Sequence, residues 1–234
     1  MSDDEANRRC DEANRRCPVC GGRETRHFIW TRGRNYYRCE ACMATYLARE
    51  QLPTLDEERA RYDEHRNDPD DPGYRDFLNR LAGPLLTRLY PGAHGLDFGC
   101  GPGPALVRIL EEAGMEMRCY DPFYDPDAGA LKERYDFVTA TEVLEHLHEP
   151  ARTICLLDAL VKPGGYLGVM TEFLTEDAAF ANWYYRSDIS HVVFYREETL
   201  RTIGKRMGWE IVIPRKNVAL FRKPLHSVGA TPSR

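Results

Sequence analysis

The second half of the chain alternates between short apolar runs and longer segments with one apolar face. The apolar runs have the length of β-strands and occupy Gly95–Gly99, Met117–Asp121, Tyr135–Thr141 and Gly165–Phe173. The segments between them repeat apolar residues at helical spacing, as in Pro104–Gly114. Because connecting helices cover both faces of a parallel sheet, this alternation predicts a mostly parallel, doubly wound α/β sheet.

Further helices are expected from the same spacing. Gly73–Tyr90 carries Phe77 and several leucines on one face, with an expected interruption near Gly83–Pro84. A helix is expected to open at Glu142–Leu147 and to continue over Ala151–Val161.

The chain ends in a different pattern. The helix expected at Arg196–Gly208 is followed by two apolar runs, Trp209–Pro214 and Val218–Lys223, with no helix between them. Two strands joined by a short turn pair antiparallel, so the final pair of the sheet is predicted to be antiparallel.

The N-terminal part contains two C-x-x-C pairs, Cys17 with Cys20 and Cys39 with Cys42, separated by 18 residues. Short strand-like runs lie between and after the pairs. This spacing is typical of a four-thiolate zinc ribbon, whose metal supplies folding energy that so small a core lacks. A redox dithiol or four purely structural cysteines are the alternatives, and two matched pairs disfavour both. We predict a structural Zn²⁺.

The predicted organisation is a disordered repeat tail at 1–16, the zinc ribbon at 17–50, a linker at 51–73, the main domain at 74–224 and a flexible tail at 225–234. The tail at the start holds the sequence DEANRRC twice, so that Cys10 is a copy of Cys17. Two copies of seven residues are too few for a coiled coil or a solenoid, and a local duplication is the simpler interpretation.

Composition narrows the class of protein. The 234 residues are 42% hydrophobic and 29% charged, with a formal net charge of -5, which is typical of a soluble globular protein and disfavours a general nucleic-acid binder. No apolar run has the length of a membrane span and the N-terminus is charged, so a cytoplasmic location is expected. The ribbon holds six Arg against three Glu, with Trp30, Tyr36 and Tyr37, so nucleic-acid binding there stays open as an alternative.

The stretch LDFGCGPG, from Leu96 to Gly103, follows a strand and precedes a helix. Glycines let a ligand approach the backbone, and the helix N-terminus offers free N–H groups. Asp121 ends the next strand, 22 residues after Gly99, where a carboxylate suits a ribose diol. A dinucleotide fingerprint requires glycine where Pro104 stands, so the loop predicts another nucleoside-containing cofactor.

Together with ATEVLEHL and VKPGG, these residues resemble the class I S-adenosylmethionine-dependent methyltransferases, in particular the branch with the ubiquinone-pathway methylases. The resemblance covers roughly residues 74–223. It implies a Rossmann-like, seven-stranded sheet whose last strand is antiparallel. One departure is that only 13 residues separate Asp121 from Tyr135, so the usual third strand is expected to be missing or vestigial.

The resemblance also implies the cofactor contacts. The glycine loop would line the methionine and ribose, Asp97 would orient the loop or the amino group, and residues after two further strands would meet the adenine and the sulfonium. The positions are Asp97, Gly99, Cys100, Gly101, Gly103, Asp121, Pro122, Phe123, Thr141, Glu142 and Val143. The side chains of Cys100, Cys119 and Cys155 are expected to serve packing. Glu142 and His146 are four residues apart, but two ligands without a third do not predict a metal site.

The acceptor is expected over the carboxyl ends of the strands, where the aromatic segment after Phe173 lies. We predict His191 as a base, Asp188 as the group that orients it and Tyr184 in the wall of the site. The alternative is that His191 only packs a turn. Tyr62, His65 and Tyr74 are alternative lid residues.

The predicted function is methyl transfer to a small molecule through an O, N or C atom. A methyltransferase acting on RNA or protein is the second hypothesis, and a non-catalytic adaptor on a methyltransferase scaffold is the third. No membrane partner is expected from the sequence pattern, and the pattern does not indicate a particular oligomeric state.

Overall fold

The structure is a computed structural model and describes residues 16–64 and 68–225. The predicted tails fall largely on residues 1–15 and 226–234, which lie outside the described residues, as does His65. The chain forms two compact units that interleave along the sequence. One holds residues 16–64, 144–153 and 172–203, and the other holds 68–143, 154–171 and 204–225.

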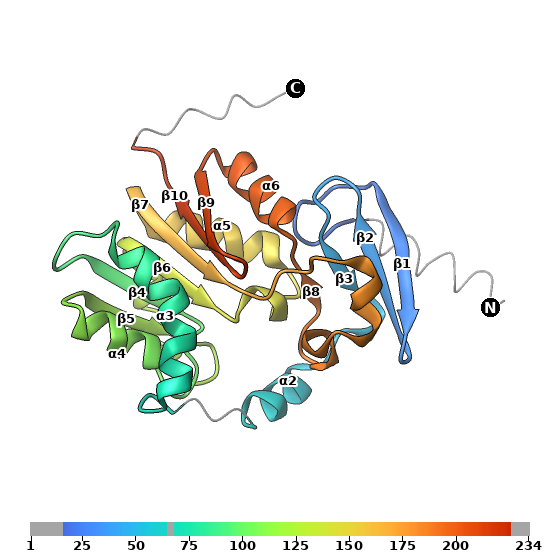
Figure 1. Cartoon of the computed structure of the whole chain (residues 1–234), viewed down its shortest axis with the longest axis horizontal. Coiled ribbons are helices and arrows are strands. Elements are labelled where there is room, and N and C mark those ends of the chain that lie inside the picture. The colour runs from blue at the N-terminus through green and yellow to red at the C-terminus, as the bar shows by residue number, and fades with distance from the viewer. Residues whose placement is uncertain (1–15, 65–67, 226–234) are drawn as a thin grey trace. The chain divides into compact units, whose positions relative to one another are not determined.

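The second unit is built on a six-stranded sheet with the order β5-β4-β6-β7-β10-β9 (Figure 1). Strand β4 is parallel to β5 and β6, and β6 is parallel to β7, whereas β10 is antiparallel to both neighbours. The bounds are β4 (His94–Phe98), β5 (Glu116–Tyr120), β6 (Tyr135–Thr141), β7 (Val161–Met170), β9 (Glu210–Arg215) and β10 (Val218–Arg222). The mostly parallel sheet and the antiparallel final pair are confirmed.

The sheet has six strands rather than seven, because the third strand that is usual in the family resembled is missing between β5 and β6, as the sequence predicted. The residues between β5 and β6 form a turn, closed by a bridge between Asp121 and Asp125, and the 3-10 helix η2 (Ala130–Lys132). Strand β5 is therefore an edge strand.

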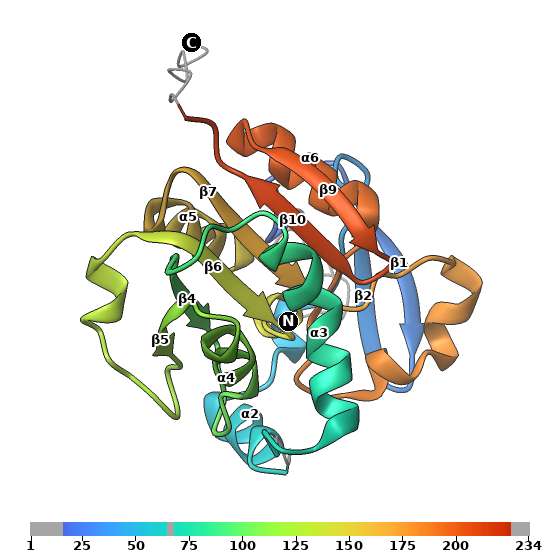
Figure 2. The same ribbon diagram turned by 60° about the vertical axis from the view of Figure 1, so that its left-hand side comes forward.

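Helices α3 (Pro72–Leu86) and α4 (Ala105–Glu112) lie on one face of this sheet (Figure 2). They share a core with β6, β7 and β10, in which Leu81, Leu85 and Phe137 are fully buried. The interruption expected at Gly83–Pro84 is wrong, because α3 continues through Pro84. Pro84 stands in the last turn, and burial of Leu81 and Leu85 offsets the backbone hydrogen bond that proline removes.

The helix expected from Glu142 is also different. Leu144–His146 forms the short 3-10 helix η3, and α5 (Pro150–Leu160) begins only at Pro150, a residue suited to the first position of a helix. Helix α6 (Glu197–Met207) follows the prediction closely.

The first unit contains a four-stranded sheet, β1 (Thr25–Thr31), β2 (Arg34–Cys39), β3 (Thr45–Leu47) and β8 (Val193–Phe194), all paired antiparallel. The three ribbon strands are as predicted, and β8 is an addition from the distant end of the chain. The unit also contains helix α2 (Leu55–Tyr62), with its capping box at Thr54 and Glu57, and the 3-10 helices η1 (Arg49–Gln51), η4 (Asp177–Asn182) and η5 (Tyr184–Ser187).

The aromatic residues of the ribbon mostly serve its core. Tyr36 is fully buried and packs edge-on against Phe180 and Phe194, whose ring centroids lie 4.9 and 5.9 Å away. Trp30, by contrast, is 63% exposed. Two of the three aromatics that suggested stacking on bases, Tyr36 and Tyr37, are therefore buried.

Across residues 16–64 and 68–225, no helix combines the length and the apolar character that crossing a membrane requires.

Candidate functional site

The glycine loop connects the end of β4 to the start of α4. Gly99 and Gly101 have φ angles of +79° and +65°, which side chains rarely adopt. A Cβ on Gly99 would also lie 2.4 Å from Cγ2 of Val143. Both glycines are therefore required by the backbone, one by its conformation and the other by conformation and close packing.

Asp121, at the end of β5, ties this loop to the neighbouring strand. Its Oδ2 accepts a hydrogen bond from the Gly101 amide at 3.0 Å, and its Oδ1 accepts from the amides of Phe123 and Tyr124 at 2.8 and 3.1 Å. A carboxylate oxygen has two lone pairs, so Oδ2 retains one for a ligand hydroxyl. The position predicted to bind a ribose thus also organises the loop.

Asp97 lies in β4, 4% exposed, and accepts a hydrogen bond from Thr139 Oγ1 at 2.7 Å. Burial raises the pKa of Asp97 to about 6, and the charge of Asp121 adds to this shift while the hydrogen bond from Thr139 opposes it. Burial, with the charges of Asp97 and Glu142, raises the pKa of Tyr74 to about 12. The carboxylates of Asp97, Asp121 and Glu142 therefore give this part of the unit a negative potential that suits a cation.

The residues that follow β6 border the glycine loop. Glu142 has a φ of +53°, an uncommon conformation for a residue with a side chain, and such backbone strain is concentrated at functional sites. Val143 contacts Gly99, as described above. The Oγ1 of Thr141 is buried and makes no hydrogen bond among the described residues, so it is a polar atom available to a ligand.

All the predicted cofactor positions belong to one unit, and the structure brings most of them together around the ends of β4, β5 and β6. Phe123 is half-buried after Asp121, while Pro122 is exposed and Cys100 is buried. Sequence reasoning missed Thr139, which holds Asp97, and gave Tyr74 only a lid role. Threonine in a buried strand carries no signal that distinguishes this contact from ordinary packing.

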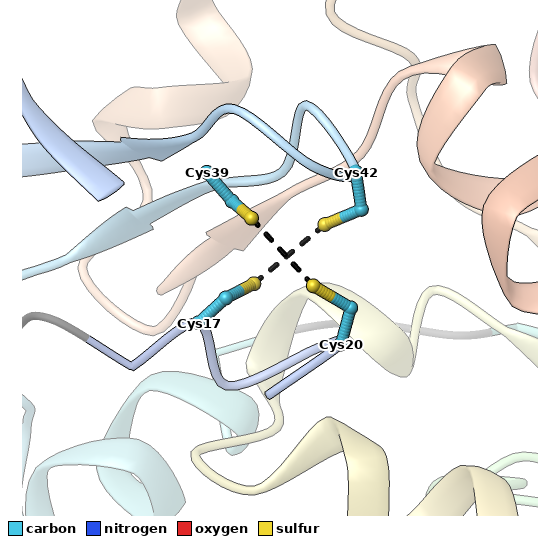
Figure 3. Close-up of side chains that lie close together, drawn as sticks. All are labelled: Cys17, Cys20, Cys39 and Cys42. Carbon is cyan, nitrogen blue, oxygen red and sulfur yellow. Dashed lines mark hydrogen bonds between the residues drawn. The ribbon is translucent and has the colours of Figure 1, made fainter. Parts of the chain in front are cut away.

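The four predicted metal ligands converge in the other unit (Figure 3). Cys17 Sγ lies 3.6 Å from Cys42 Sγ, and Cys20 Sγ lies 3.6 Å from Cys39 Sγ. Sulfurs around a tetrahedral zinc with Zn–S bonds of about 2.3 Å are about 3.8 Å apart, so the donor set fits this ion. All four cysteines are buried, and the Gly22 amide donates to Cys20 Sγ at 3.4 Å.

The two C-x-x-C turns have matching backbones. Gly21 follows the first pair with a φ of +69°, and Met43 follows the second with a φ of +64°. The amide of Gly21 bonds to the Cys17 carbonyl, and that of Met43 bonds to the Cys39 carbonyl, at 2.8 and 2.9 Å. Each turn aims both of its sulfurs at one point.

The predicted acceptor-side residues belong to the same unit as the cysteines. His191 is 7% exposed, and its Nδ1 lies 2.7 Å from the Tyr185 carbonyl oxygen. Asp188 accepts hydrogen bonds from Arg61 Nε at 2.9 Å and Ser190 Oγ at 2.6 Å. Although burial acts to raise it, these bonds hold the pKa of Asp188 well below its ordinary value. Tyr184 is 70% exposed, whereas Tyr185 is buried.

Comparison with known proteins gives the family. A sequence model described as a methyltransferase domain matches residues 62–213. The ubiquinone biosynthesis O-methyltransferase of Aeromonas salmonicida is 36% identical over 83 residues, which are 34% of this chain and 34% of that protein. The protein of the same name from Serratia proteamaculans is 36% identical over 73 residues, 31% of this chain and 30% of its own. The match spans about a third of the length of these curated relatives.

Among solved structures, magnesium protoporphyrin IX methyltransferase from Synechocystis PCC 6803, with bound SAH, is 17% identical with a TM-score of 0.49, over 72% of this chain and 93% of that one. An O-methyltransferase family protein from Burkholderia thailandensis is 17% identical with a TM-score of 0.48, over 75% and 65% of the two chains. Since the family model matches well over half of the 234 residues, the chain belongs to the methyltransferase-domain family.

Proposed function

We propose that this protein transfers a methyl group from S-adenosylmethionine to a small-molecule acceptor. The observation that carries the proposal is the glycine loop surrounded by Asp97, Asp121 and Glu142 in one unit. S-adenosylmethionine is cationic and contains a ribose, and when bound it supplies a methyl group on a sulfonium, which is a good leaving group. The task left to the protein is to bind, to orient and to exclude water.

Each part of the site has a proposed role. Gly99, Gly101 and Gly103, with the backbone of Cys100, leave room for the methionine and ribose. The carboxylate of Asp97 attracts the ammonium group, and that of Asp121 accepts from a ribose hydroxyl. The remaining predicted positions meet the adenine or the sulfonium end, and they are Pro122, Phe123, Thr141, Glu142 and Val143.

On the acceptor side we propose that His191 is the general base that accepts the proton of a hydroxyl acceptor. A carbonyl oxygen only accepts, so the 2.7 Å contact with Tyr185 fixes the proton on Nδ1 and leaves the Nε2 lone pair available. The carbonyl of Tyr185 thus orients the ring in place of Asp188, for which this role was predicted, and Asp188 supports the turn through Arg61 and Ser190. Tyr184 is proposed to contact the acceptor from the exposed side.

We also propose that Cys17, Cys20, Cys39 and Cys42 hold one structural Zn²⁺. The support is the donor set itself: four buried thiols that lie within 4.8 Å of one another on two matched turns. A closed site of four sulfurs leaves no open position for chemistry, so the ion contributes folding energy only.

The test of the function uses S-adenosylmethionine labelled in its methyl group, added to the purified protein together with a small-metabolite extract, RNA and protein. The expected result is label in small molecules, and the variant Asp121→Asn is expected to lose most of it. Label only in RNA or protein would favour the second hypothesis. Cofactor binding with no transfer would favour the adaptor.

A further inference from the structure

Three potential metal ligands outside the cysteine site converge in the same unit. Two of them, Glu145 and His146, lie in η3. The third, His191, lies two residues before β8. One donor atom from each lies within 4.8 Å of the others. We propose that Glu145, His146 and His191 form a second metal site, which binds a divalent transition-metal ion such as Zn²⁺, Mn²⁺ or Fe²⁺.

The two imidazoles are held in a tautomer that can bind a metal through Nε2. Nδ1 of His191 lies 2.7 Å from the Tyr185 carbonyl oxygen, and Nδ1 of His146 lies 3.2 Å from the Ser190 carbonyl oxygen. Because carbonyl oxygens only accept, both Nδ1 atoms carry the hydrogen and both Nε2 atoms keep a lone pair. Histidine ligands of metals are held in this way by a backbone carbonyl on the other nitrogen.

The carboxylate of Glu145 is also held in place by a hydrogen bond. Glu145 is fully buried, and its Oε1 accepts a hydrogen bond from Tyr185 at 2.6 Å, the kind of contact that orients a ligating carboxylate. Its Oε1 also lies 3.8 Å from Nε2 of His146. A divalent cation between these atoms would pair with the carboxylate in this buried position.

The backbone around the three ligands is fixed by long-range hydrogen bonds. The Val192 amide donates to the Glu145 carbonyl at 2.8 Å, and the Tyr195 hydroxyl donates to the Leu144 carbonyl at 3.0 Å. Donors around a tetrahedral ion with bonds of about 2.1 Å are about 3.4 Å apart. The three donor atoms lie within 4.8 Å of one another, so an inward movement of the side chains by about 1 Å brings them to bonding distance.

The ligand types decide which ions fit. Two imidazoles and one carboxylate suit zinc and other first-row transition metals, whereas Mg²⁺ and Ca²⁺ prefer oxygen ligands throughout. Three protein ligands also leave open coordination positions, unlike the four-cysteine site. A water molecule or an oxygen atom of the acceptor would fill them, and this last consequence rests on the proposed methyl transfer. With an ion bound, His191 acts as its ligand.

The sequence pattern suggested Glu142 with His146 and lacked a third ligand. The η3 turn is a 3-10 helix rather than an α-helix, so the four-residue spacing does not apply, and Glu145 takes the place of Glu142. His191 comes from a segment 45 positions further along the chain.

The experiment is a titration of the full chain, purified with zinc in its four-cysteine site, with Co²⁺. The expected result is about one further cobalt per chain, with the weak visible bands of nitrogen and oxygen ligands and no thiolate charge-transfer band. In ¹H NMR, two exchangeable resonances from the Nδ1–H groups should be strongly shifted by the ion and should vanish in D₂O. Both readouts are independent of activity, so they do not depend on the proposed methyl transfer.

Variants assign the site. Glu145→Gln and His146→Ala should each lower cobalt affinity at least tenfold while retaining zinc on the cysteines, which reports that the unit is folded. His27→Ala removes an exposed histidine of β1 and should leave the titration unchanged. Absence of a second cobalt in the wild-type protein, or a second cobalt that all three variants retain equally, would overturn the proposal. The wild-type NMR result decides the matter even where a variant does not fold.

Discussion

At the scale of single residues, Asp97 shows how burial and function are linked. The fold removes its carboxylate from water, which disfavours the anion, and places it near the anionic Asp121. The buried anion is unstable in the cofactor-free protein, and a cation that binds beside the carboxylate stabilises it. Asp97 is therefore better suited to attracting a cationic cofactor than an exposed aspartate would be.

The affinity for S-adenosylmethionine should consequently fall in acid. With a pKa of about 6, Asp97 is an anion at pH 7.5 and mostly protonated at pH 5, where it no longer attracts the ammonium group. Calorimetric titration at the two values should show an affinity about tenfold weaker at pH 5, with protons released on binding at the lower pH. Asp97→Asn should bind weakly at both values. A wild-type affinity that does not change over this range would contradict the assignment.

His191 is the residue on which the acceptor chemistry is proposed to depend. His191→Gln should lower turnover roughly 100-fold or more, since it removes a group that handles the acceptor proton directly or through a bound ion. Its effect on cofactor affinity should be small, because the cofactor residues belong to the other unit. Steady-state kinetics with calorimetry as the second readout separates the two. Normal turnover in the folded His191→Gln variant would contradict this role and would mean that the protein catalyses transfer by positioning the reactants alone.

At the scale of elements, long periodic segments could be predicted and short irregular ones could not. The strands around the glycine loop, the antiparallel end of the sheet and the ribbon strands follow directly from apolar patterning. Strand β8 has two residues and pairs with β3 through contacts that no local pattern encodes. Residues 142–147 carry helix-forming side chains and so predict an α-helix where the structure has the η3 turn, and no local pattern marks the turn that separates η3 from α5.

The same limit applies to the site. Asp97, Asp121 and the loop glycines could be predicted because a motif fixes their spacing along the chain. Glu145 could not, since its relation to His191 depends on a hydrogen bond between the Glu145 carbonyl and the Val192 amide. Contacts between segments distant in sequence determine this part of the molecule.

The two cysteine turns allow a matched comparison. Gly21 and Met43 occupy equivalent places with φ angles of +69° and +64°. Gly21→Ala should destabilise the protein by about 1 kcal/mol, since no atom is close enough to clash and only the backbone strain remains. Met43→Gly should relieve the same strain and raise stability by a few tenths of a kcal/mol to about 1 kcal/mol. Urea unfolding curves measure both, and changes of the same sign would contradict the equivalence of the turns.

At the scale of the whole molecule, the chain folds as two interleaved units, and the ribbon is not an independent appendage. Its sheet takes β8 from residues 193–194, and Arg38 of β2 donates to Asp177 at 2.7 Å. Phe180 packs against Tyr36 of the same sheet. The four-cysteine cluster and the aromatic segment after Phe173 therefore belong to one structural unit.

Removal of the metal should accordingly loosen both parts together. In hydrogen exchange, a strong chelator or Cys39→Ser should raise the exchange of amides in β1, β2 and β3 and also in residues 177–194. Cys155→Ser is the matched control and should have no such effect, because Cys155 is exposed and lies outside the cluster. The packing role expected for Cys155 from the sequence is therefore wrong. Faster exchange restricted to residues 17–50 would show that the ribbon folds and unfolds alone.

The central claim is that the glycine loop and Asp121 bind S-adenosylmethionine, and calorimetry of the purified chain tests it most directly. The account predicts micromolar-scale binding of S-adenosylmethionine and no comparable binding of NAD. Asp121→Asn should weaken the binding about 10- to 100-fold, because a charge-assisted hydrogen bond to the ribose is lost. Asp125→Asn, in the same turn, should bind like the wild type. A preference for NAD, or an Asp121→Asn variant that binds S-adenosylmethionine as tightly as the wild type, would contradict the account.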